Sequence, residues 1–200
     1  LGLIVASILG YLAYQKFVKG PQEKVAADEL AFPKAYFEDA MTNSVAVDSL
    51  LTLGLNGADG KYGFVDIASE YSGTKAGNLA NYYAGMAYLN TGKYQEAIQY
   101  LDKFKADDAN VAPIAKGAIG DAFAQLDQQQ EALKYYENAA SMSSSDLTAP
   151  RFLLKAGITA INLGNSAVAL KHFNTIIENY PKSPESKKAI LYQGKAEAMQ

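Results

Sequence analysis

Few side chains in this sequence could do covalent or acid–base chemistry. The chain has no cysteine and a single histidine, His172, so no cluster of thiolates and imidazoles could hold a metal ion. A lone histidine in a helical segment is usually partly exposed and structural, and we expect that of His172. The sequence therefore predicts no catalytic residue, no metal site and no cofactor.

Two glycines, Gly54 and Gly60, suggest a phosphate-binding loop at first sight. Five residues separate them where a P-loop has four, and Tyr62 stands where a serine or threonine would bind magnesium. Asp59 and Asp66 could suggest calcium, but the ligand spacing of a calcium loop is missing. We predict neither site, and binding to other proteins is the chemistry that remains.

The composition is that of an ordered protein. With 49% hydrophobic residues among 200, the chain can form one domain and an additional segment. The net charge of −3 is small and argues against a nucleic-acid partner. The absence of cysteine excludes disulfides but fits both cytosolic and bacterial extracytoplasmic proteins.

Residues 78–111 carry the clearest structural pattern. Apolar residues recur at three- and four-residue spacings over 78–90 and again over 94–105, as in two amphipathic helices that each bury one face. A tight turn, Thr91-Gly92-Lys93, separates the two segments. A connection this short predicts that the two helices are antiparallel.

The same helix pair recurs with a period of about 35 residues, which is typical of helical solenoids. Small residues mark equivalent positions of successive first helices (Gly85, Gly120, Gly157 and Gly194) and second helices (Ala97, Ala132 and Ala169). Glycine within a helix is less favourable than alanine by about 1 kcal/mol. We therefore expect a neighbouring helix to cross at each of the four glycines, leaving no room for a side chain.

This pattern resembles the tetratricopeptide repeat. That family has a small residue in the first helix, a turn glycine, an alanine and an aromatic residue in the second helix, and a closing proline, here Gly157, Gly164, Ala169, Phe173 and Pro181. The resemblance covers residues 78–200 and implies an all-α, right-handed helical solenoid. Its repeats fall at about 78–111, 113–146 and 150–183, with a closing helix at 184–200. The family's tryptophan is absent, and Asp127 replaces one turn glycine.

The first eighteen residues, LGLIVASILGYLAYQKFV, are uncharged as far as Tyr14. A helix of that length reaches about 27 Å, just short of a bilayer core of about 30 Å. Because the chain starts on leucine, we expect residues upstream and interpret 1–19 as part of a transmembrane helix. Its membrane residues would be Leu3, Ile4, Val5, Ile8, Leu9 and Leu12. An uncleaved signal segment, an interfacial helix and an apolar helix buried in the solenoid are the alternatives.

Residues 20–77 are interpreted as a linker and a degenerate first repeat that caps the solenoid. Gly20-Pro21 is expected to end the preceding helix. Pro33 is expected to kink the helical pattern over 22–41 or to restart it. The segment 62–72 aligns with the second helix of the third repeat, which places Phe64 opposite Phe173.

In tetratricopeptide proteins the first helices line a concave face. On that pattern the lining residues here are Leu79, Tyr82, Met86, Leu89, Ile114, Asp121, Gln125, Arg151, Leu154, Ile158 and Asn162. Relatives that clamp a terminal carboxylate use lysine and asparagine at four of these positions, which are apolar or aromatic here, so no such clamp is predicted. The lining fits a helix or an extended apolar segment of a partner, unless the chain's own last helix fills it.

The layout of one span followed by a small repeat domain resembles the YfgM-like family of bacterial inner-membrane proteins. The stretch GFVDIASEYSGTKAGNLANYYAGMAYL resembles members from Bacteroidetes-type bacteria. The resemblance implies a non-enzymatic scaffold anchored in the inner membrane with its repeats in the periplasm. Its partners would be translocon subunits, periplasmic chaperones and secretory chains, with no nucleic acid or small-molecule substrate.

Two points stay open. An anchored adaptor of another envelope assembly, in outer-membrane biogenesis or secretion, is the alternative function. Lys16, Lys19 and Lys24 follow the predicted span, and by themselves they favour a cytoplasmic repeat domain. A periplasmic one requires a larger excess of lysine and arginine upstream.

Overall fold

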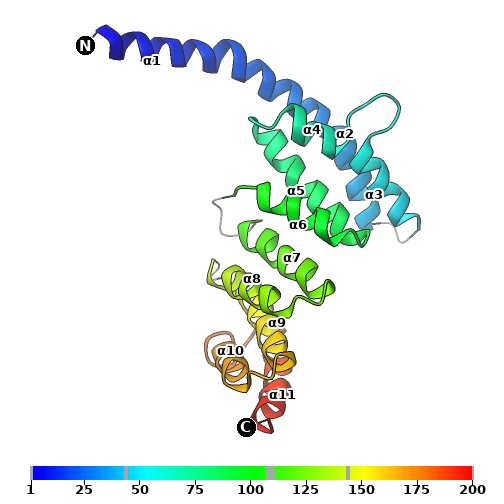
Figure 1. Cartoon of the computed structure of the whole chain (residues 1–200), viewed down its shortest axis with the longest axis vertical. Helices are drawn as coiled ribbons and strands as arrows, with labels where there is room; N and C mark the ends of the chain where they lie inside the picture. Colours follow the sequence, from blue (N-terminus) through cyan, green and yellow to red (C-terminus); the bar gives the residue numbers. More distant parts are fainter. Residues whose placement is uncertain (1, 43–44, 107–110, 143–144, 200) are drawn as a thin grey trace. The chain divides into compact units, whose positions relative to one another are not determined.

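A computed structural model describes residues 2–42, 45–106, 111–142 and 145–199, and within these residues the secondary structure is helical (Figure 1). The helices are α1 Gly2–Tyr14, α2 Gly20–Thr42, α3 Val47–Asn56, α4 Phe64–Glu70, α5 Lys75–Asn90, α6 Tyr94–Lys103, α7 Val111–Gln125, α8 Gln129–Ser141, α9 Ala149–Asn162, α10 Ser166–Asn179 and α11 Ser186–Glu197. The chain forms two compact units, residues 1–93 with α1 to α5 and residues 94–200 with α6 to α11. The division falls after the turn at Gly92, inside the predicted repeat 78–111.

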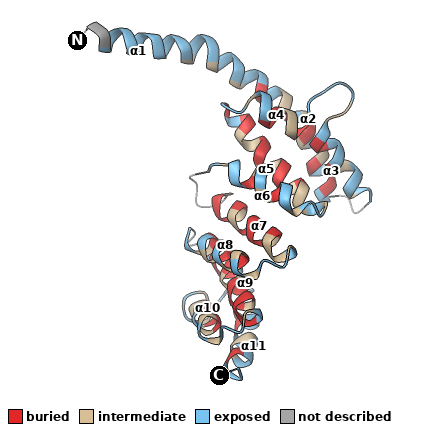
Figure 2. Ribbon diagram, viewed as in Figure 1, coloured by how far each residue is buried: buried red, intermediate tan, exposed pale blue. Residues whose placement is uncertain are grey.

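The predicted transmembrane helix is not supported. Among the described residues, no helix combines the length and the apolar character needed to cross a bilayer. The α-helix that begins at Gly2 ends after 13 residues, and a π-helical turn, Gln15–Lys19, follows it. The side chain of Leu3 lies outside the described part, and the other predicted membrane residues are exposed (Figure 2): Ile4, Val5, Ile8, Leu9 and Leu12.

The predicted break at Gly20-Pro21 is wrong, because the helical backbone continues through it. The backbone N–H of Gly20 donates to the carbonyl of Gln15, five residues back, and α2 begins at Gly20 itself. Pro21 has no N–H to donate to a carbonyl of the preceding turn, and the π-helical turn Gln15–Lys19 lies directly before it. The helix does not restart at Pro33 either, since Pro33 lies buried inside α2.

An aromatic cluster forms the centre of the first unit. Phe64 of α4 is fully buried and stacks on Tyr83 of α5 with ring centroids 5.2 Å apart, while Phe37 of α2 meets the Tyr83 ring edge-on at 5.1 Å. The N–H of Gly63 donates to the Asp66 carboxylate at 3.2 Å, which closes the first turn of α4. Helix α4 thus lies within the segment predicted to be helical, and three helices meet at the Phe64 ring.

The second unit repeats one contact between paired helices. A Cβ atom at Gly120 of α7 would lie 2.7 Å from the ring of Tyr136 of α8, and one at Gly157 of α9 would overlap the ring of Phe173 of α10. The prediction that a neighbouring helix leaves no room for a side chain is confirmed at these two glycines. It is wrong at Gly194 of α11, where a Cβ atom would meet nothing within 4 Å among the described residues.

The turn between α7 and α8 explains how Asp127 can replace a glycine. Gly92 and Gly164, at the equivalent turns, have φ of 75° and 74°, and Asp127 adopts the same left-handed conformation with φ 59°. Aspartate tolerates this region better than most residues because its short polar side chain bonds locally. The turn therefore keeps its geometry without glycine.

Candidate protein-binding surface

The residues predicted to line a concave face lie on α5 in the first unit and on α7 and α9 in the second. On α5 they form one side of the helix, and all four are half-buried: Leu79, Tyr82, Met86 and Leu89. Thr74 starts this helix three residues earlier than predicted, because its hydroxyl accepts the N–H of Gly77 at 2.9 Å.

A cleft opens beside Leu79, between α2 and α5. Its floor is apolar and is formed by Ala27, Leu30, Ala31, Ala76 and Leu79. Its rim is charged and is formed by Glu23, Lys34 and Lys75. This cleft combines an apolar floor with a polar edge, which is the usual construction of a peptide-binding site.

The rim charges are not balanced. The Glu23 carboxylate accepts the backbone N–H of Lys75 at 2.9 Å, at the positive end of the α5 dipole. Lys34 pairs with Glu38 at 3.2 Å, and that hydrogen bond raises the pKa of Lys34. The Lys75 ammonium forms no ion pair within the described part of the chain. Positive charge therefore remains available at the mouth of the cleft.

On α7 the predicted residue Asp121 is engaged by its own unit. Its carboxylate accepts the Tyr136 hydroxyl at 2.7 Å and pairs with the Lys155 ammonium at 2.5 Å. Lys155 also lies 5.5 Å from the centroid of the Tyr136 ring. Burial and the neighbouring Asp121 charge raise the pKa of Tyr136 far above its ordinary value, so the hydroxyl stays a donor. The three side chains join α7, α8 and α9.

The remaining predicted residues of the second unit do not share one environment. Leu154 is buried, and with the half-buried Ile158 it belongs to an apolar cluster that includes Ala189 and Ala196 of α11. At these two residues α11 contributes to the packing of the predicted lining. The other four are half-buried or exposed: Ile114, Gln125, Arg151 and Asn162.

Comparisons with known proteins bear on residues 67–146 and 152–183. Sequence models of the family described as tetratricopeptide repeat match residues 67–112, 84–146 and 152–183, which together are more than half of the chain. The chain carries tetratricopeptide repeats. These matches indicate no catalytic family.

No curated protein matches the chain. Among solved structures, "Crystal structure of PcrH in complex with the chaperone binding region of PopB" is similar, with a TM-score of 0.46 and 20% identity. The match covers 63% of this chain and 96% of that chain. A similarity of that size adds nothing to what the repeats already show.

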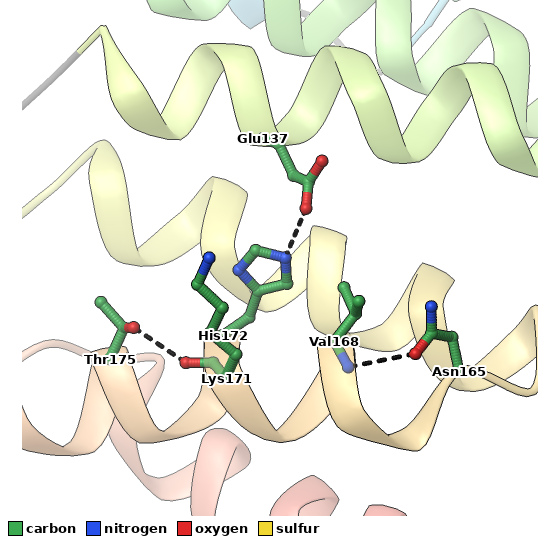
Figure 3. Close-up of polar contacts among 6 residues, drawn as sticks. All are labelled: Glu137, Asn165, Val168, Lys171, His172 and Thr175. Carbon is green, nitrogen blue, oxygen red and sulfur yellow. Dashed lines mark hydrogen bonds and ion pairs between the residues drawn. The ribbon is translucent and has the colours of Figure 1, made fainter.

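The last two tetratricopeptide repeats contain a polar contact that the sequence did not reveal (Figure 3). His172 of α10 is 6% exposed, and its Nε2 lies 2.9 Å from a carboxylate oxygen of Glu137 of α8. The expectation of a partly exposed histidine is wrong. Burial lowers the pKa of His172 more than Glu137 raises it, so the neutral ring donates its Nε2–H to the carboxylate. A single histidine in an amphipathic pattern gives no sign of such a partner.

Proposed function

We propose that the chain is a non-enzymatic protein-binding scaffold that holds an apolar segment of a partner in the cleft between α2 and α5. Tetratricopeptide repeats are typically scaffolds of this kind. The observation that carries the proposal is the cleft itself: alanine and leucine side chains form its floor, and Leu79 within it is half-buried. Apolar surface that the fold leaves open in this way is available to a partner.

The cleft suits one large apolar side chain flanked by carboxylates. Burying a leucine or phenylalanine side chain contributes about 1.5–3 kcal/mol. Lys75 at the rim attracts acidic groups and disfavours basic ones, whereas Lys34 is already paired with Glu38.

The absence of tryptophan from the chain gives this proposal a direct test. The probe is an amphipathic peptide of about 15 residues, long enough for a marginal helix, with one tryptophan in a leucine stripe and glutamates on the other face. We expect a saturable blue shift of the tryptophan emission on titration with the full chain. Leu79→Ser should weaken binding about tenfold, which corresponds to about 1.4 kcal/mol.

Val25→Ser is the matched control, because Val25 lies on α2, is 48% exposed and does not line the cleft. It should bind like the wild type. Equal affinities of the Leu79 and Val25 variants would exclude the cleft as the binding site. Stronger binding of a peptide with lysines in place of the glutamates would contradict the assigned charge.

A narrower form of the proposal follows from the resemblance to YfgM-like proteins. The partners would be translocon subunits, periplasmic chaperones and secretory chains, and the chain would work at the bacterial inner membrane with its repeats in the periplasm. Since no described helix could cross a bilayer, this part rests on the resemblance alone. Photo-crosslinkers at Leu9 and Tyr82 in native membranes test it. Adducts with subunits of another envelope assembly would favour the adaptor alternative.

A further inference from the structure

Helix α11 exposes an apolar surface that no described part of the chain covers. Leu191 is 73% exposed, Ile190 is 55% exposed, and a Cβ atom at Gly194 would meet nothing within 4 Å. Ile190, Leu191, Gly194 and Ala198 together form the outer face of α11. Two large exposed aliphatic side chains beside an open glycine form an apolar patch on an otherwise polar helix end.

The opposite side of α11 is firmly packed. Ala189 and Ala196 are fully buried, and the ring of Tyr192 stacks on Phe173 of α10 with centroids 6.0 Å apart. The Gln193 amide also donates to the Asn174 side chain at 2.8 Å. These contacts fix the orientation of α11, so the outer face is presented to solvent as a preformed surface.

Each residue of the outer face has a counterpart on α9. The alignment that sets Gly194 beside Gly157 also sets Leu191 beside Leu154 and Ala198 beside Ile161. On α9 this surface belongs to one packed cluster with residues of α10 and α11: Leu154 is 8% exposed, Ile161 is 6% exposed, and the Phe173 ring of α10 fills the space above Gly157. In the preceding repeat the Tyr136 ring fills the space above Gly120 in the same way.

The outer face of α11 is therefore built like the surface that carries the second helix of a repeat. A glycine at this position leaves space for an aromatic ring from an antiparallel helix, as at Gly120 and Gly157. The difference is that no described side chain enters the space above Gly194. A helix placed there would bury Leu191, whose counterpart Leu154 is buried, and would partly bury Ile190, whose counterpart Leu153 is half-buried.

Charge around the outer face indicates which helix fits. Three exposed lysines, Lys187, Lys188 and Lys195, surround it, and none forms an ion pair within the described residues. Glu197 is the one exposed carboxylate on the helix, so positive charge prevails. A second copy of α11 would set lysines against lysines, which is unfavourable, whereas an acidic helix would be attracted.

We infer that the outer face of α11 binds an acidic amphipathic helix of a partner protein. The partner helix lies as α10 lies on α9, with an aromatic side chain over Gly194 and carboxylates beside Lys187, Lys188 and Lys195. This surface belongs to the second unit, and the inference does not depend on the cleft between α2 and α5.

Helix α10, which packs on α9, is the template for the probe peptide. A synthetic peptide with the sequence of residues 165–181 carries Trp in place of Phe173 and Glu in place of Lys171, and the full chain contains no other tryptophan. Tryptophan emission is followed as the full chain carrying Leu79→Ser is added, because the cleft between α2 and α5 is itself proposed to bind acidic amphipathic peptides. We expect saturable binding with a blue shift, which weakens as salt is added because the lysines and carboxylates are exposed.

Two substitutions on α11 test the geometry. Leu191→Glu adds a like charge to the acidic peptide, and Gly194→Leu fills the space meant for the ring; each should weaken binding about tenfold or more. Leu147→Glu is the control, because Leu147 is 73% exposed, as is Leu191, but lies in the loop before α9. It should leave binding unchanged.

Any of four results would overturn the inference. These are the absence of binding, equal binding by the Leu191 and Leu147 variants, full binding by the Gly194→Leu variant, and tighter binding of a peptide with lysine at the glutamate position. A dimer of the full chain in sedimentation, dissociated by Leu191→Glu alone, would show that a second copy occupies the face instead.

Discussion

Helices α9 and α11 hold the same place in successive repeats but end in different environments. On α9, Leu154 is 8% exposed and Gly157 lies under the Phe173 ring; on α11, the counterpart Leu191 is 73% exposed and Gly194 is open. The glycine and the leucine three residues before it recur in both helices, whereas the buried Ala160 of α9 is replaced by Glu197 in α11. The comparison shows that a small residue in a repeat permits close packing of two helices. The close contact forms only where a second helix is present.

The largest expected loss of stability comes from removing the Phe173 ring, which fills the space above Gly157 of α9. Phe173→Ala removes a fully buried ring that covers Gly157 and stacks on Tyr192. We expect the free energy of unfolding to fall by about 3–5 kcal/mol, as for other buried aromatic residues. Urea unfolding followed by circular dichroism measures it. A loss no larger than that of an exposed substitution such as Leu147→Ala would contradict the assigned packing.

The next largest loss of stability is expected when a methyl group is added at Gly157, beside the Phe173 ring. In Gly157→Ala the new methyl group meets the Phe173 ring, and overpacking of this kind destabilises by about 1–3 kcal/mol. The double variant Gly157→Ala with Phe173→Leu sharpens the result. If the methyl and the ring meet, the two changes are not additive and the double variant recovers part of the loss. Strict additivity would show that they do not touch.

A smaller loss is expected where the repeats are joined by polar contacts. Tyr136→Phe removes the hydroxyl that donates to Asp121, while Asp121 keeps its pairing with Lys155. We expect a loss of about 1.5 kcal/mol, typical of one hydrogen bond to a charged group. Tyr135→Phe is the control, because Tyr135 is half-buried and its hydroxyl makes no hydrogen bond within the described residues. The two variants should differ in urea midpoint, and equal midpoints would count against the network.

The contact between α8 and α10 predicts a pH dependence. Burial lowers the pKa of His172 in the folded chain below its ordinary value of 6.5, while Glu137 raises it and Lys171 lowers it. The unfolded chain then binds more protons, so this contribution to stability is present above pH 6.5 and is lost as the pH falls below it.

Urea unfolding at pH 7.5 and 5.5 checks this, with the histidine contribution read as the difference between the wild type and His172→Gln. Glu137→Gln removes the group that favours the charged ring, so it should increase the loss at acidic pH. Identical pH profiles of the wild type and His172→Gln would exclude the effect.

Local pattern predicted much of the helical array, because helices and their small packing residues repeat within about 35 residues. It located the helices on either side of Gly92 and the crowded glycines Gly120 and Gly157. It failed where the outcome depends on distant parts of the chain. The partner of His172 lies on a neighbouring helix that the local pattern does not specify, and the space at Gly194 is open because no described helix covers it.

The candidate binding surface also combines a part that local pattern predicted and a part that depends on distant residues. The half-buried side of α5 follows from its periodicity, and Leu79 was predicted to bind. The cleft around Leu79 was not foreseen, because its other wall is α2, which lies about fifty residues earlier in the chain. The backbone geometry that carries the helix through Gly20-Pro21 was also missed, since a proline within a helical pattern usually ends or kinks the helix.

The comparison between α9 and α11 is tested most directly by placing one methyl group at each glycine and measuring the free energy of unfolding. Gly157→Ala should lower it by about 1–3 kcal/mol. Gly194→Ala should leave it unchanged or raise it by up to about 1 kcal/mol, because the methyl enters open space and alanine favours the helix. Equal losses in the two variants would mean that a neighbouring group already lies over Gly194, and would contradict the account of α11.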